Sequence, residues 1–134
     1  MVKQTSFAIR AVRTARITGG IPMNEFIIWC DERTKDCMAR KAALSADGRG
    51  DEAAFMQIRA NVYGIFRTVY TAVKGDLTQL QARLTSIPAA WEAALHEAEI
   101  HGDEAKAHIE RIKLETVAAI RHYVANTQEA ECHE

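Results

Sequence analysis

The sequence predicts an all-α protein, a helical bundle of four to six helices with short Gly/Asp/Pro turns and a long C-terminal helix or helical hairpin. Apolar residues recur every three or four positions, which is the helical period, through most of the 134 residues. Only two prolines, Pro22 and Pro88, interrupt the chain. A content of 48% hydrophobic and 26% charged residues is typical of a globular domain with a core of its own.

The first helix of the predicted bundle spans residues 24–45. Asn24 is suited to the N-cap, and Met23 is placed to pack on Ile28 as a hydrophobic staple. The helical period predicts one buried stripe, with Thr34 and the stem of Lys41 in line with it. Its apolar members are Phe26, Ile27, Cys30, Cys37, Met38 and Leu44.

A turn at residues 45–51, SADGRGD, leads to a second helix that begins near Asp51. Gly75 interrupts the helical spacing that follows, and Asp76 with Gln79 has the spacing of a capping box, so we expect a break at residues 74–76. The apolar series runs through this break and comprises Phe55, Ile58, Val62, Phe66, Val69, Val73, Leu77, Leu80, Leu84 and Ile87.

Pro88 predicts another helix boundary at residues 86–88, because proline favours the first turn of a helix and disfavours helix in the residue before it. The last stretch reaches about Thr127 and ends in a tail, NTQEAECHE, that we expect to be frayed. Gly102 favours a hairpin, although a heptad seam continues in phase across it. The seam residues are Trp91, Leu95, Ala98, Gly102, Ala105, Ile109, Ile112, Thr116, Ala119 and Tyr123.

The charges divide the chain into a basic arm, residues 1–22, and a single helical domain, residues 23–134. The arm carries four basic residues and no acid, whereas the domain carries 13 basic and 18 acidic residues, a net charge of −5. An amphipathic arm of this kind can contact nucleic acid, an anionic membrane surface or an acidic protein surface. The candidate contact residues for nucleic acid or a partner are Arg10, Arg13, Arg16, Arg33, Lys35, Arg40 and Lys41.

The arm ends in Thr18-Gly19-Gly20, whose codons can contain AGGAGG, the ribosome-binding sequence of bacteria, a short distance before Met23. One hypothesis is therefore a bacterial protein whose native translation starts at Met23. The alternative is a Gly-Gly-Ile-Pro linker between two translated helices.

Four residues, Glu97, His101, Glu104 and His108, are spaced by four, three and four and would line one stripe of an unbroken helix. Such a stripe could bind a metal ion. However, the chain has neither the Glu-x-x-His motif of di-iron bundles nor His-Glu-x-x-His, and a turn at Gly102 would divide the four residues. A metal-binding bundle is therefore the last of our functional hypotheses.

No other group of residues predicts catalysis or a bound cofactor. Cys132 and His133 adjoin in the tail, but a catalytic cysteine needs a positioned base and a group that orients it. The apolar runs are far shorter than a transmembrane helix. Cys30 and Cys37, seven apart on one helix, are too distant for a disulfide, so we expect reduced thiols and a cytoplasmic protein.

Three functional hypotheses follow. The leading one is a non-enzymatic interaction protein, an adaptor, regulator or oligomeric subunit, acting through helix–helix contacts or self-association. The second is a nucleic-acid-associated accessory protein or a small subunit of a ribonucleoprotein or mobile-element system, based on the basic residues named above. The third is the metal-binding bundle.

Overall fold

The computed structural model describes residues 23–132, with the side chains of residues 25–127. This part of the chain forms four helices and no strand: α2 (Met23–Ala46), α3 (Gly50–Ala72), α4 (Leu77–Ile100) and α5 (Glu104–Cys132). The all-α prediction is confirmed. None of these helices is both long and apolar enough to cross a membrane.

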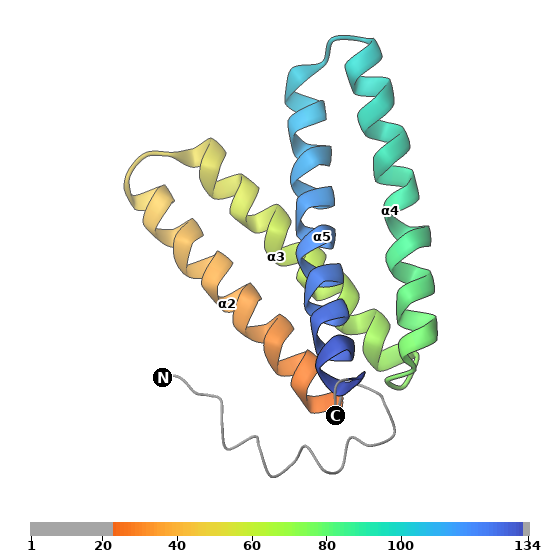
Figure 1. Ribbon diagram of the computed structural model, residues 1–134. Coiled ribbons are helices and arrows are strands. Elements are labelled where there is room, and N and C mark those ends of the chain that lie inside the picture. The colour runs from red at the N-terminus through yellow and green to blue at the C-terminus, as the bar shows by residue number, and fades with distance from the viewer. Residues whose placement is uncertain (1–22, 133–134) are drawn as a thin grey trace.

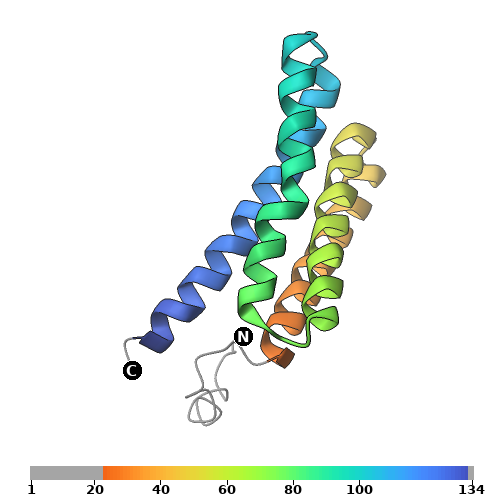
Figure 2. The same ribbon diagram turned by 90° about the vertical axis from the view of Figure 1, so that its right-hand side faces the viewer.

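The four helices form two hairpins. α2 packs along α3, α4 packs along α5, and α3 joins the two pairs through its contacts with α5 and α4. The hairpins meet near the α3–α4 turn, where rings from the start of α2 contact Tyr123 of α5, and Figure 1 shows them diverging toward the α2–α3 and α4–α5 turns. Figure 2 shows the last turns of α5 leading away from α2. The bundle therefore has a closed end and an open end.

Two predicted breaks are confirmed. Gly75 and Gly102 have φ of +77° and +71°, the left-handed region that favours glycine, and both lie between helices. Asp76 caps α4, since its carboxylate accepts a hydrogen bond of 3.1 Å from the backbone N–H of Gln79. Asp103 caps α5 in the same way by accepting from the N–H of Lys106 at 3.1 Å.

The predicted helix boundary at Pro88 is wrong, because α4 continues through it. Proline lacks an N–H, so it leaves the carbonyl four residues earlier, that of Leu84, without its helical donor. Arg121 of α5 donates from Nη2 to this carbonyl at 2.6 Å. A side chain from the neighbouring helix thus replaces the missing backbone hydrogen bond, which explains how a buried proline is accommodated inside α4.

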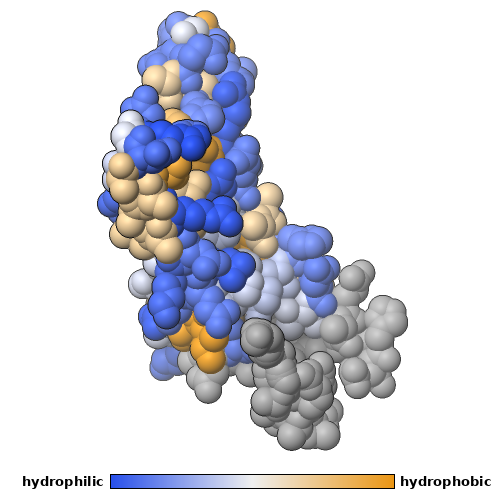
Figure 3. Space-filling view, turned by 90° about the vertical axis from the view of Figure 1, so that its left-hand side faces the viewer, coloured by the Kyte–Doolittle hydropathy of each residue, from blue (hydrophilic) through white to orange (hydrophobic). Residues whose placement is uncertain are grey.

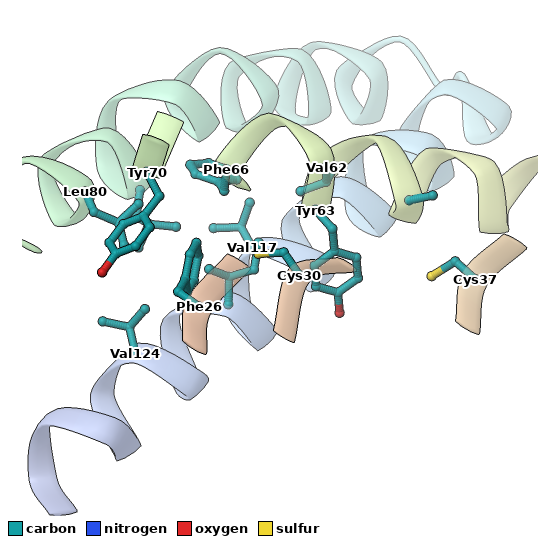
Figure 4. Packing of buried hydrophobic residues seen from close by; sticks show 13 residues of the cluster. Phe26, Cys30, Cys37, Val62, Tyr63, Phe66, Tyr70, Leu80, Val117 and Val124 are labelled. Atoms are coloured by element: carbon teal, nitrogen blue, oxygen red, sulfur yellow. The ribbon is translucent and has the colours of Figure 1, made fainter. Parts of the chain in front are cut away.

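The core is richest in aromatic rings at the closed end (Figure 4). Phe26 is fully buried, with its ring centroid 4.6 Å from that of Tyr70 and 6.1 Å from that of Tyr123. Trp29 stacks on Tyr123 with centroids 4.2 Å apart. These rings link α2 to both α3 and α5, and Figure 4 shows Cys37 some way from them along α2.

Most predicted core positions are buried or half-buried, including every member of the series from Phe55 to Ile87. Met38 and the staple residue Ile28 are exceptions, being 38% and 53% exposed, because α2 packs mainly on α3 and leaves its other sides open. Ala105 and Ala119 of the predicted seam are exposed as well. A single heptad seam is the pattern of a helix that packs on one partner helix. α5 instead packs on both α3 and α4, so it buries two faces. α5 extends to Cys132, beyond the predicted end of the last helix near Thr127.

Candidate functional site

The turn at Gly102 divides the four candidate metal ligands. Glu97 and His101 remain together on the α4 side, with His101 Nε2 3.2 Å from Glu97 Oε1. His108 lies on α5 and packs edge-on against Phe55 of α3, with centroids 4.5 Å apart. Within the described part of the chain, no three His, Cys, Asp or Glu side chains are grouped so that they could hold a metal ion.

The candidate basic residues of α2 do not form one patch. Arg33 pairs with Asp36 at 3.2 Å, and Lys41 donates to Gln57 of α3 at 2.7 Å. Arg40 and Lys35 are exposed, but they lie on opposite sides of the helix, five positions apart. Arg10, Arg13 and Arg16 lie outside the described residues.

Folding instead brings one of these arginines, Arg33, near an aromatic ring of α3. Trp29 and Tyr63 meet edge to face with centroids 5.6 Å apart. Burial raises the pKa of Tyr63 and Cys37 adds to the rise, whereas the nearby positive charges of Arg33 and Arg59 oppose it. We call Trp29, Arg33, Arg40, Arg59 and Tyr63 the basic–aromatic flank. Arg40 belongs to it because it lies seven residues after Arg33 and therefore on the same face of α2.

The arginines of the flank are accessible to a partner, whereas Tyr63 is 9% exposed and one face of the Trp29 ring is covered by Tyr123. The side chains of Arg33 and Arg59 are 40% and 30% exposed, and their ion pairs with Asp36 and Glu115 lie at the surface. Arg33 Nε is buried and makes no hydrogen bond. Surface ion pairs of this kind contribute little to stability, so their charges remain available to an incoming group.

The α4–α5 turn has the opposite character. Residues 89–105 contain five acidic residues and no lysine or arginine. Ile100 stands among them and is 62% exposed, more than the other exposed large hydrophobic residues of the described chain. We call Glu97, Glu99, Ile100, Asp103 and Glu104 the acidic tip. All five are exposed, and Glu99 is bound by Arg111 at 3.1 Å.

Glu110 belongs to none of the predicted sites, yet its side chain is only 2% exposed. Its Oε2 accepts from Lys106 at 3.0 Å and from Lys113 at 3.3 Å, while Oε1 is buried without a partner. Lys113 also lies over the ring of Trp91, 5.5 Å from its centroid. The sequence contains one signal of this burial. Glu110 comes seven residues, about two helical turns, before the core residue Val117 and therefore lies on the same face of the helix.

The two described thiols are not suited to nucleophilic chemistry. Cys30 and Cys37 are free and buried. Burial raises the pKa of Cys30 to about 12, with a further contribution from Asp31. A thiol that stays protonated at neutral pH is a poor nucleophile, so Cys30 acts as a core residue.

The comparisons with known proteins assign no family to this chain, since no family model, curated protein or solved structure matches it.

Proposed function

We propose that this chain is a non-enzymatic helical interaction protein, a cytoplasmic adaptor, regulator or oligomeric subunit that works through surface contacts, including those of the acidic tip. The observation that carries the proposal is the exposure of Ile100 at the acidic tip. A large aliphatic side chain that is exposed among charged residues is costly in water and gains free energy when a partner covers it. Ile28 and Ile65, 53% and 37% exposed, offer further apolar contact area.

The arrangement of the helices supports the same function. α2 is covered mainly by α3, and Figure 1 shows the α2–α3 and α4–α5 turns lying apart, although Phe55 of α3 and His108 of α5 still meet a few residues from those turns. Figure 3 shows apolar patches within the largely hydrophilic surface on the α2–α3 side. Apolar patches bordered by polar groups are typical of surfaces that bind other proteins.

The proposal is tested by combining light scattering with affinity capture of the full chain, using Ile100→Ser and, as a matched control, Ala90→Ser on an exposed part of α4. We expect the wild type and the control to bind a protein partner, either a second copy or another protein, and Ile100→Ser to lose most of this binding. A chain that is strictly monomeric and captures no protein would overturn the proposal.

A second candidate function, a nucleic-acid-associated accessory protein, is favoured by the basic–aromatic flank. Its arginines can contact phosphate groups, and the part of Trp29 that Tyr123 and Tyr63 leave uncovered is the aromatic surface on which a base could stack. Gel shifts at low salt with DNA and RNA, with and without residues 1–22, test this function. Retardation that Arg33→Glu and Arg40→Glu abolish would support it, and an absence of retardation in every combination would exclude it.

A further inference from the structure

We propose that the partner is a second copy of this chain, and that the acidic tip of each copy docks on the basic–aromatic flank of the other. This inference rests on the proposed function and adds the identity of the partner. The two surfaces lie on different hairpins, with the tip on α4–α5 and the flank on α2–α3.

Charge complementarity is the first argument. Residues 89–105 carry five acidic and no basic residues, whereas Arg33 and Arg40 of the flank share one face of α2, with Asp36 as the acid between them. Arg59 of α3 adds a positive charge beside Tyr63. Opposed charges steer association and select the relative orientation of two surfaces.

Apolar complementarity is the second argument. Ile100 is a single protruding aliphatic side chain. The flank presents the uncovered part of Trp29, which is half-buried between Tyr63 and Tyr123, and the accessible Arg33 and Arg40 side chains on the same helix. Aromatic and arginine side chains are the residues that most often supply binding free energy at protein interfaces, and an aliphatic side chain that packs among them is a typical anchor.

Geometry is the third argument. Figure 1 places the α4–α5 turn far from the start of α2 within one molecule, so a copy does not cover its own Trp29 with its own tip. Because every copy carries both surfaces, two copies related by a two-fold axis can make the contact twice. Such a closed arrangement doubles the buried area and prevents further growth.

The test is sedimentation velocity on the full chain over a range of concentrations, at low and at high salt. We expect a dimer at low salt that dissociates as salt is raised, because the contacts are charged and lie at the surface. Two charge-reversed proteins are then prepared, Arg33→Glu/Arg40→Glu and Glu97→Lys/Glu99→Lys. Each alone should dimerise about a hundredfold more weakly, because like charges face each other at both contacts.

Mixing the two charge-reversed proteins provides the decisive control. In the mixed pair both contacts again join opposite charges, so we expect a heterodimer of nearly wild-type affinity, whereas misfolded variants would not associate. Ala90→Ser serves as the neutral control. A chain that remains monomeric at high concentration, or a mixture that fails to associate, overturns the inference. If that monomer captures a different protein through Ile100, the proposed function stands and self-association alone is excluded.

Discussion

The α2–α3 hairpin and the outer half of the α4–α5 hairpin, from Pro88 to Thr116, bury different kinds of side chain. The first buries large rings, those of Phe26, Tyr63, Phe66 and Tyr70. The second buries mainly small or polar groups, namely Pro88, Ala98, Ala107, Glu110 and Thr116, together with Ile112.

This difference shows that two halves of one bundle can be stabilised by different physical terms. Apolar burial dominates where the rings meet, and it contributes in proportion to the area removed from water. In the outer half, Lys106 and Lys113 donate to Oε2 of the buried Glu110, and just before it Arg121 donates to the carbonyl of Leu84. Removing such a donor leaves a buried group unsatisfied, which costs more than the bond itself contributes.

The largest expected effect is on the aromatic side. Phe26→Ala removes a ring that is 0% exposed and contacts Tyr70, Trp29 and Tyr123. We expect the free energy of unfolding to fall by about 3–5 kcal/mol, from lost burial and the cavity that remains. Urea unfolding followed by circular dichroism measures the change, with Ile65→Ala on the exposed surface as the control. A loss below about 1 kcal/mol would show that other rings fill the space.

The next effect concerns the donors of Glu110. Lys106→Met/Lys113→Met keeps the apolar stems but leaves a buried carboxylate with no cation, so we expect a loss of about 3 kcal/mol. Adding Glu110→Leu to this variant should recover most of the loss, because no buried charge then remains. If Lys106→Met/Lys113→Met is as stable as the wild type, the Glu110 carboxylate must reach water. The two lysines would then not be what stabilises a buried charge in the outer half.

A smaller effect is expected at the proline of α4. Arg121→Met removes the donor to the Leu84 carbonyl and should cost about 1–3 kcal/mol. In a Pro88→Ala background the alanine N–H can serve this carbonyl, so the same substitution should cost less than about 0.5 kcal/mol. Equal costs in the two backgrounds, measured by urea unfolding, would contradict the proposed role of Arg121.

The smallest effect is a pH dependence of the aromatic side. In the folded chain burial raises the pKa of Cys30 from its ordinary value of 9.0 to about 12. The unfolded thiol therefore ionises first, and stability that is fully present below pH 9 is lost as the pH rises toward 12. We expect a decline of about 1 kcal/mol by pH 10 from this residue, and a shallower decline in Cys30→Ala. Identical pH profiles for the two proteins would show that the buried thiol is not responsible.

Local rules predicted the helices and two of their turns well. Gly75 and Gly102 lie in turns because their left-handed backbone is a property of glycine itself, and Asp76 caps α4 through a residue three positions away. Pro88 was misjudged for the opposite reason, since the donor that replaces its N–H is Arg121, 33 residues later along the chain. No local pattern reports such a partner.

The candidate surfaces show the same limit. The sequence marked Arg33 and Arg40, but Arg59 and Tyr63 of the basic–aromatic flank come from α3, and only folding places them beside α2. The predicted metal site required Glu97 to His108 to form one straight helix, but the turn at Gly102 divides its four residues between α4 and α5. Ile100 could have been noticed, because it lies outside the predicted seam and next to a predicted turn.

By itself the sequence determined the all-α class, the position of most helices and most of the core, because helical periodicity and glycine turns act over a few residues. The tertiary structure decided the rest. It determined that two hairpins close at one end only, that Arg121 maintains α4 through Pro88, and that a carboxylate is buried at Glu110. Each of these depends on contacts between helices, whose partners are far apart in the chain and therefore leave no periodic signal in it.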